Sequence, residues 1–239
     1  MALEGKRIVV LGGTSGIGFA TAKGAAKEGA LVVVASSNQT KVDTALSQLP
    51  ASAEGKTIDL KSEDSIREFF AAIGPFDHLV YTAGDSLKMD EIKNTSFADA
   101  QAFLQTRFWG AYLSVKYAAD QIRQGGSIVL SSGMAGRRPR KAWTLVASIC
   151  GAMESFTRAL AVELAPLRVN IVCPGQVKTE LWNALPEEAR EAMWRRAEQL
   201  FPVGRAGEPE EAAEAYLYLM RAGFTTGSVV IADGGASLV

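Results

Sequence analysis

Short hydrophobic runs alternate with amphipathic stretches along nearly the whole chain. The hydrophobic runs, rich in Val and Ile, lie at residues 7–11, 31–35, 56–60, 78–82, 127–131, 168–172 and 228–232. Most of them lack polar alternation, which is typical of strands buried on both faces of a parallel sheet. The amphipathic stretches between them cover 16–28, 39–49, 62–73, 97–123, 144–164 and 208–221. Strand alternating with helix predicts β–α–β units with right-handed crossovers.

No linker, repeat or low-complexity segment divides the chain. We therefore expect residues 1–239 to form a single α/β domain with a doubly wound parallel sheet. One further helix-prone segment, 180–201, falls between the sixth strand and the last helix and contains Trp182, Met193, Trp194 and Phe201.

Composition and charge narrow the class of protein. The chain of 239 residues is 48% hydrophobic and 21% charged with a formal net charge of −1, so no global field points to nucleic acid or a membrane. Cys150 and Cys173 suggest a reducing compartment, without a disulfide framework or metal-ligand spacing. No signal peptide is visible, and no apolar run approaches the ~18 residues of a membrane span. We expect a soluble, cytoplasmic protein without a metal site.

A glycine pattern follows the first predicted strand. Gly12, Gly16 and Gly18 lie in "VVLGGTSGIGFATAKGAAKEGA", between that strand and the first helix. Glycine permits a tight turn and a close backbone approach, and the helix amides then face an anion such as a pyrophosphate. The alternative is a plain tight turn, but the strand–turn–helix context favours dinucleotide binding.

The G-x-x-x-G-x-G spacing resembles the short-chain dehydrogenase/reductase family, and the likeness extends over almost the whole chain. "TAG" (82–84), "SS" (131–132), "RVNIVCPGQVKTEL" (168–181) and "TTGSVVIADGG" (225–235) match family motifs in order. The resemblance implies seven strands in the order 3-2-1-4-5-6-7, and Ser132 as the residue that polarises the substrate carbonyl. It also implies these cofactor contacts: Gly12, Thr14, Ser15, Gly16, Ile17, Gly18, Asp59, Leu60, Ala83, Gly84, Pro174, Gly175, Val177 and Thr179.

The segment after the second strand bears on the choice of dinucleotide. An acidic residue there normally binds the ribose 2′-hydroxyl of NAD, but "ASSNQTK" (35–41) contains none. Ser36, Ser37 and Asn38 can donate hydrogen bonds, and Lys41 can add charge, although no Arg offers a bidentate contact. This pattern favours NADP(H) over NAD(H); a polar turn indifferent to the cofactor is the alternative.

The family's proton-transfer pair is missing. Its members carry a Tyr, and a Lys four residues later, on the helix after the Ser strand. Alignment through "GAMESFTRALAVEL" places Val146 at the Tyr position and Cys150 at the Lys position. Valine transfers no proton, and a thiol supplies no fixed positive charge. Arg107 stands where the family usually has a relay Asn, which makes it a candidate catalytic cation.

A literal Tyr-x-x-x-Lys does occur at Tyr112 and Lys116. It lies on the helix before the Ser strand, so we interpret it as unrelated to catalysis. His78, the only histidine, opens the fourth strand at the edge away from the cofactor and is expected to be structural.

Three functions remain open. In the first, the protein is a nicotinamide-dependent oxidoreductase that acts on a carbonyl or alcohol, such as a quinone or acyl-type substrate, with altered acid–base chemistry. Alternatively, it is a dinucleotide-binding regulatory subunit without turnover. The third possibility is other chemistry in the same pocket, such as elimination or hydration. The intact nicotinamide-binding stretch favours the first two.

Two surface segments bear on partners. The basic loop "GRRPRKAW" (136–143) would stand near the substrate entrance and suit an anionic or carrier-linked substrate, unless it is simply a solvated loop. Segment 180–201 resembles a mobile substrate lid, with apolar side chains for an apolar substrate or for a neighbouring subunit. The family resemblance also implies that the helices at 97–123 and 144–164 pair between subunits, in a homodimer or homotetramer.

Overall fold

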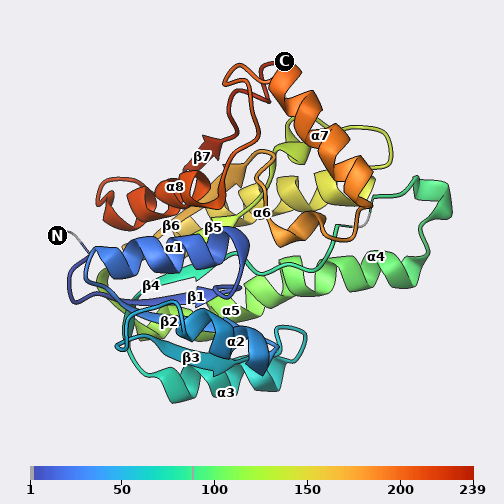
Figure 1. Ribbon diagram of the computed structural model, residues 1–239. Coiled ribbons are helices and arrows are strands. Elements are labelled where there is room, and N and C mark those ends of the chain that lie inside the picture. Colours follow the sequence, from blue (N-terminus) through green and yellow to red (C-terminus); the bar gives the residue numbers. More distant parts are fainter. Residues whose placement is uncertain (1–2, 88) are drawn as a thin grey trace.

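The computed structural model describes residues 3–87 and 89–239, which form one seven-stranded parallel sheet covered by helices on both faces (Figure 1). The strand order is β3-β2-β1-β4-β5-β6-β7, as expected from the sequence. The strands are β1 (Arg7–Leu11), β2 (Leu31–Ser36), β3 (Glu54–Thr57), β4 (Phe76–Tyr81), β5 (Ile122–Ser131), β6 (Arg168–Pro174) and β7 (Val229–Ala232).

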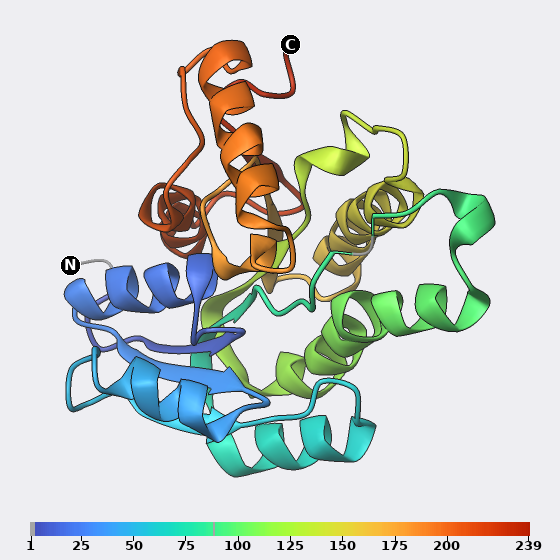
Figure 2. The same ribbon diagram turned by 45° about the vertical axis from the view of Figure 1, so that its right-hand side comes forward.

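Helices cover the sheet on both faces (Figures 1 and 2). The α-helices are α1 (Gly16–Lys27), α2 (Gln39–Leu46), α3 (Glu63–Ile73), α4 (Phe97–Leu104), α5 (Ala111–Ala118), α6 (Thr144–Glu163), α7 (Glu187–Leu200) and α8 (Pro209–Arg221). Shorter turns are η1 (Ile92–Asn94), η2 (Gln105–Gly110), η3 (Ala119–Gln121), η4 (Met134–Gly136) and η5 (Glu180–Trp182). Helices α1, α2 and α8 pack on one face, and α3, α5 and α6 on the other.

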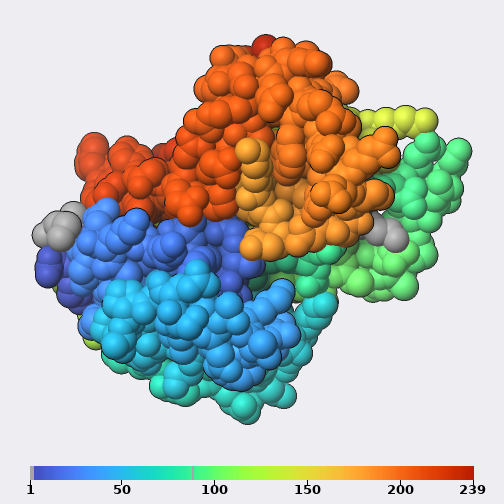
Figure 3. All heavy atoms as spheres, viewed as in Figure 1, coloured from blue at the N-terminus to red at the C-terminus, as the bar shows by residue number. Residues whose placement is uncertain are grey.

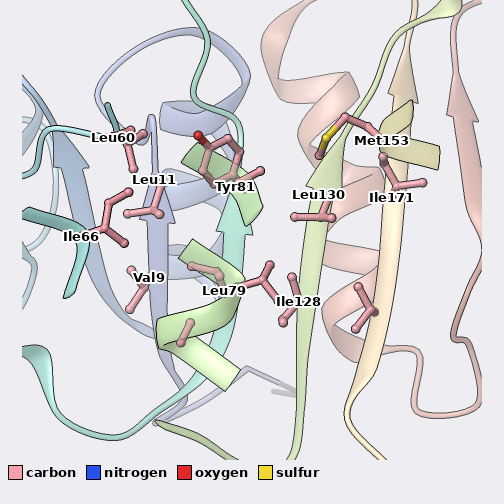
Figure 4. Close-up of a cluster of buried hydrophobic side chains, with 14 of the residues drawn as sticks. Val9, Leu11, Leu60, Ile66, Leu79, Tyr81, Ile128, Leu130, Met153 and Ile171 are labelled. Atoms are coloured by element: carbon pink, nitrogen blue, oxygen red, sulfur yellow. The ribbon is translucent and has the colours of Figure 1, made fainter. Parts of the chain in front are cut away.

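Each face of the sheet has its own hydrophobic core, because successive side chains of a strand point to opposite sides. In β1, Val9 and Leu11 belong to the core under α3, α5 and α6, which Figure 4 shows. Ile8 and Val10 belong to the core under α1 and α8. All four side chains are fully buried, and each contributes roughly 1.5–3 kcal/mol of transfer free energy. The unbroken apolar run of β1 thus has the two-sided burial predicted from the sequence.

Two elements differ from the sequence expectation. The helix expected over 97–123 is interrupted: α4 passes into the π-helical turn η2 and then α5, and β5 already begins at Ile122. The third strand lies at Glu54–Thr57 instead of 56–60 and is the exposed edge of the sheet. Ile58 and Leu60, the apolar residues behind the 56–60 expectation, instead enter the core from the loop after this strand.

The expectation that no apolar run approaches the length of a membrane span does not hold for helix α6. By length and composition alone, its 20 residues suffice to cross a bilayer. Its buried face includes Val146, Ile149 and Met153, which belong to the core of the sheet. The apolar character of α6 therefore has a packing explanation.

The carboxyl ends of the parallel strands meet at one edge of the sheet. Neighbours β2 and β4 lie on either side of β1, so the chain changes direction across the sheet at the end of β1. Ligands of doubly wound folds bind in the crevice at such a switch point. In this protein that crevice lies between the glycine turn after β1 and the loop after β4.

Candidate functional site

The glycine turn is closely packed. A Cβ atom on Gly12, whose φ is 81°, would lie 2.7 Å from the Ala83 Cα. A Cβ atom on Gly18 would lie 2.3 Å from the Gly12 carbonyl oxygen and from Thr82 Oγ1. The side chain of Ser15, which precedes α1, makes no capping hydrogen bond. The first amides of α1 are therefore left uncapped by that side chain, as an anion-binding helix terminus requires.

A cavity of about 390 Å³ lies over this turn, and we call it the glycine-loop cavity. Of the residues predicted to bind cofactor, Gly12, Thr14, Ser15, Gly16, Ile17, Gly18, Ser36, Ser37, Asp59, Leu60, Ala83, Gly84, Pro174 and Thr179 line it. The cavity therefore runs from the end of β2, past the glycine turn, to the end of β6.

Three predicted cofactor residues lie outside the lining of this cavity. Asn38 instead caps α2, where its Oδ1 accepts a hydrogen bond from the Lys41 amide at 3.0 Å. Asn38 is followed by the first helical residue, so its short polar side chain satisfies an amide of the first turn. Gly175 and Val177 line the neighbouring apolar cavity instead.

Other residues that the sequence analysis did not name as cofactor contacts also line the glycine-loop cavity, among them Lys61, Thr82, Asp85, Thr106, Glu180 and Tyr216. Thr82 directly precedes Ala83 and Gly84, which were predicted to contact the cofactor, so its place in the sequence was a signal that it lines the same cavity. Tyr216 comes from α8, and only the folded chain brings it to Ser131, whose hydroxyl lies 2.8 Å from the Tyr216 hydroxyl.

A second, apolar cavity of about 120 Å³ adjoins the first. We call it the apolar cavity; its hydrophobic lining comprises Ile17, Leu87, Met89, Met134, Ala135, Trp143, Val146, Ile149, Val177, Leu181 and Trp182. Arg107 and Ser132 line both cavities. The two residues predicted to be catalytic thus lie at the junction of the cavities.

Arg107 is held at this junction by neighbours on several sides. Its guanidinium donates a hydrogen bond to the Asp85 carbonyl oxygen and lies 5.2 Å from the centre of the Phe103 ring. Its Nε is buried and has no hydrogen-bond partner among the described residues. Burial lowers the pKa of Arg107, while the charge of Asp85 acts in the opposite direction. An unsatisfied buried donor is costly, so this Nε has capacity for a ligand acceptor.

Ser132 follows β5 directly, and its amide donates a hydrogen bond to the Val172 carbonyl at 2.8 Å. Its hydroxyl donates to Oε1 of Glu154 on α6 at 3.5 Å. Burial raises the pKa of Cys173 on β6, and the adjacent Ser132 side chain works against that rise. The Ser132 hydroxyl therefore lies between two titratable side chains.

Val146 and Cys150 both face the apolar cavity from α6. Burial raises the pKa of Cys150 to about 11, with a contribution from Cys173. The Cys150 thiol is therefore neutral near pH 7. Neither position provides a group that ionises close to neutrality.

The literal Tyr-x-x-x-Lys pair lies elsewhere. Tyr112 is partly exposed and packs against Trp109 and Phe156. Lys116 forms a 2.8 Å ion pair with Glu63 of α3. Neither residue is in the lining of the two cavities, which agrees with our interpretation of the pair.

His78 also lies where the sequence placed it, near the amino end of β4. It is buried, and its Nδ1 lies 2.8 Å from the Ser127 hydroxyl. Burial, reinforced by the charge of Arg168, lowers its pKa from 6.5 to about 4. The surroundings of His78 are therefore those of a residue that packs inside the sheet, at a distance from the cofactor end of the strands.

A doubly wound parallel sheet, a glycine turn at its switch point and a serine after β5 together define a dinucleotide-binding α/β protein. The profile of a protein family described as "Enoyl-(Acyl carrier protein) reductase" matches residues 12–237. The chain belongs to the short-chain dehydrogenase/reductase family.

Individual relatives agree with this family. The short-chain dehydrogenase/reductase ATR9 of Stachybotrys chlorohalonatus is 38% identical, over 99% of this chain and 98% of the relative. A crystal structure of a small-chain dehydrogenase in complex with NADPH has a TM-score of 0.87 and 36% identity, covering 99% of this chain and 100% of that one. MalC reductase/Diels-Alderase from Malbranchea aurantiaca has a TM-score of 0.93 and 31% identity, with coverages of 100% and 98%.

Proposed function

We propose that this protein is a nicotinamide-dependent oxidoreductase that reduces a carbonyl group, or oxidises the matching alcohol, with altered acid–base chemistry. One observation carries the proposal: Arg107 and Ser132 are a cation and a hydroxyl at the junction of the glycine-loop cavity and the apolar cavity. A carbonyl oxygen placed there meets two hydrogen-bond donors, which stabilise the negative charge that develops during reduction.

The residues present fit a dinucleotide. The glycine turn has no room for side chains, the amides of α1 are uncapped by Ser15, and Thr179 closes over the turn, within 3.1 Å of a Cβ built on Gly16. In this proposal the glycine turn and α1 bind the pyrophosphate, Asp59 lies near the adenine, and Pro174 and Thr179 hold the nicotinamide end. A bound reduced nicotinamide supplies the hydride.

We favour NADP(H) as the cofactor. Ser36, Ser37 and Lys41 line the cavity at the end of β2, and none of them is acidic. A cation and two hydroxyls suit a 2′-phosphate, whereas a carboxylate at this place would repel it. The related small-chain dehydrogenase structure that contains NADPH supports the same preference.

The acid–base chemistry in this proposal does not use the helix positions of the family pair. Val146 and the neutral Cys150 offer neither a phenol nor a cation to the cavity. Loss of general acid catalysis typically costs ~10²–10⁴-fold in rate, which an electron-poor carbonyl tolerates best. Quinones and activated ketones are therefore the substrate class we favour, with Arg107 stabilising the developing oxyanion.

The basic loop supports an anionic substrate. Arg137, Arg138 and Arg140, from the loop before α6, line a cavity of about 480 Å³ together with Arg196 of α7. Burial lowers the pKa of Arg140, and the charges of Arg196 and Arg138 lower it further. An anionic or carrier-linked group on the substrate would relieve this repulsion. Arg137 pairs with Glu154 and Arg138 with the Val239 carbonyl, so part of the cluster is already engaged.

Segment 180–201 is proposed as a lid over the substrate. In the structure it comprises η5 and α7, and Figure 3 shows this orange segment lying above the blue N-terminal segment on one face. Trp182 and Leu181 line the apolar cavity, and the Trp182 and Trp194 rings lie 6.3 Å apart. Closure of this segment would exclude water from a hydride transfer.

We also propose a homodimer or homotetramer. Trp109 and Tyr112 are 48% and 44% exposed on η2 and α5, and Val162 on α6 is 81% exposed. These apolar side chains lie on the helices that the family resemblance assigns to subunit contacts. Light scattering at micromolar concentration tests this proposal, and a monomer mass would refute it.

The test of function begins with cofactor binding. Purified protein is titrated with NADPH and NADH while tryptophan and nicotinamide fluorescence are followed. Micromolar binding, tighter for NADPH, followed by oxidation of bound NADPH on mixing with 9,10-phenanthrenequinone, would support the proposal. Binding without oxidation by quinones or activated ketones would instead support the alternative of a dinucleotide-binding regulatory subunit, which the neutral Val146–Cys150 face favours. Absence of binding at millimolar cofactor would reject both.

A further inference from the structure

Helix α6 carries three positions at intervals of four residues: Val146, Cys150 and Glu154. Residues spaced by four lie on one face of a helix. The first two line the apolar cavity, and Glu154 lies one turn further, with its carboxylate toward Ser132. Glu154 is therefore the next side chain on this face, and it is a carboxylate.

The surroundings of Glu154 connect the cavities with the surface. Its Oε1 accepts the hydrogen bond from Ser132 at 3.5 Å, and its Oε2 lies 3.0 Å from a guanidinium nitrogen of Arg137. The side chain of Glu154 is only 12% exposed, whereas that of Arg137 is 36% exposed. The chain of contacts thus begins at Ser132 in the cavity wall, passes through a nearly buried carboxylate and ends at a solvated side chain.

We propose that Glu154 relays protons between solvent and the substrate oxygen through the Ser132 hydroxyl. This inference rests on the proposed function. Glu154 does not line either cavity, so it acts only through Ser132 and is not itself a catalytic residue in contact with substrate.

The proton and electron balance is complete. During reduction the carbonyl carbon gains a hydride from the bound reduced nicotinamide, and the electron pair of the C=O π bond moves to oxygen. That oxygen takes the Ser132 proton, Ser132 takes the proton of the Glu154 carboxyl, and the carboxylate takes one proton from solvent. One proton is consumed for each hydride transferred. In the direction of alcohol oxidation the same carboxylate accepts the proton.

Other titratable groups near Glu154 are less suited to this role. From its own helix, Cys150 has a pKa raised by burial to about 11. From β6, burial raises the pKa of the Cys173 thiol, which is fully buried. From the loop before α6, the guanidinium of Arg137 offers only hydrogen-bond donors. Glu154 is the one carboxyl group among these neighbours, and its Oε1 lies within hydrogen-bond distance of the Ser132 hydroxyl.

The first test requires no turnover. Protein labelled with ¹³C at the glutamate carboxyl carbons is measured by NMR, and the Glu154 signal is assigned as the one absent from Glu154→Gln. In Ser132→Ala the carboxylate loses a hydrogen-bond donor, so its carboxyl signal near neutral pH should move away from the wild-type position. A Glu154 signal that Ser132→Ala leaves unchanged would overturn the relay.

The second test follows the pH dependence of a single turnover with NADPH and a ketone. The wild-type reduction rate should fall as pH rises, because each turnover draws one proton from solvent through the Glu154 carboxyl group. In Glu154→Gln the rate should be lowered by roughly 10²-fold at the wild-type optimum and should lose this dependence. Glu163→Gln, an exposed change on the same helix, is the matched control and should behave as wild type.

The outcomes separate the relay from the proposed function. A wild-type protein that reduces no carbonyl would reject both together. An active wild type whose pH profile persists in Glu154→Gln would overturn the relay alone. A purely structural Glu154, holding the Arg137 loop, would lower activity in the variant without flattening the profile.

Discussion

The guanidinium of Arg107 packs against the backbone of Gly84: a Cβ atom on residue 84 would lie 2.6 Å from an Arg107 terminal nitrogen, Nη1. Gly84 belongs to the loop after β4, whereas Arg107 comes from the π-helical turn η2. On its other side, Arg107 lies 5.2 Å from the Phe103 ring centre. The absence of a side chain at Gly84 thus permits a cation to reach the edge of the glycine-loop cavity.

Arg107→Gln should lower the rate of hydride transfer by roughly 10²–10³-fold, because one charged donor to the developing oxyanion is removed. The dissociation constant for NADPH should change little. Stopped-flow measurement of NADPH oxidation, alongside the fluorescence titration, separates these effects. Lys116→Gln, which removes the ion pair with Glu63 on the surface, is the control and should retain activity. If Lys116→Gln lowered the rate of hydride transfer more than Arg107→Gln does, our assignment of Arg107 as the donor to the oxyanion would be wrong.

Ser37→Asp should weaken NADPH binding by about tenfold or more, which corresponds to about 1.4 kcal/mol. The new carboxylate would lie in the cavity wall beside Ser36 and Lys41, where it would repel a 2′-phosphate. NADH carries no such phosphate, so its dissociation constant should stay similar or decrease. Fluorescence titrations with both cofactors measure the ratio. Equal weakening of both would show that this segment does not distinguish them.

Glu180→Gln should tighten the binding of both NADPH and NADH several-fold. Glu180 Oε2 lies 3.3 Å from a Cβ built on Gly16, so a carboxylate stands at the turn that we expect to bind the pyrophosphate. Removing this charge removes a repulsion that salt screens only in part. The gain should shrink between 50 mM and 500 mM salt. Weaker binding by the variant would instead mean that Glu180 is needed to shape the loop after β6.

Much of the fold could be predicted from the chain because two-sided burial produces continuous apolar strands. The run of β1, with Val9 and Leu11 in one core and Ile8 and Val10 in the other, is an example. The bounds of edge strand β3 were not predicted, because Glu54–Thr57 carries little apolar surface. The sequence analysis placed the strand at 56–60 instead, because Ile58 is apolar; in the structure Ile58 belongs to the core from the loop after β3.

The site was predicted less completely, because much of it depends on contacts between distant segments. The glycine turn has a local signature, so the sequence named its residues, which line the glycine-loop cavity in the structure. Asn38 lies outside the lining of the glycine-loop cavity, and its short polar side chain caps α2. Glu154 lies 22 residues after Ser132, and no local sequence pattern predicts the contact between these two side chains.

The unfolding free energy should depend on pH through His78. The native imidazole, buried against Ser127, has a pKa of about 4, below its ordinary 6.5. Between these values the unfolded chain binds a proton that the native chain does not, so this contribution to stability is present above about pH 6.5. It is lost as pH falls toward about 4 and amounts to about 3 kcal/mol.

Urea denaturation between pH 4.5 and 7 measures this dependence, with His78→Gln as the comparison. The variant has no imidazole to protonate in the unfolded chain, so its stability should fall less steeply over this range. Because the chain contains a single histidine, one imidazole NMR signal reports the native protonation state directly. That signal should remain that of the neutral ring down to pH 5. Titration of the native ring near pH 6.5, or equal slopes for both proteins, would contradict the prediction.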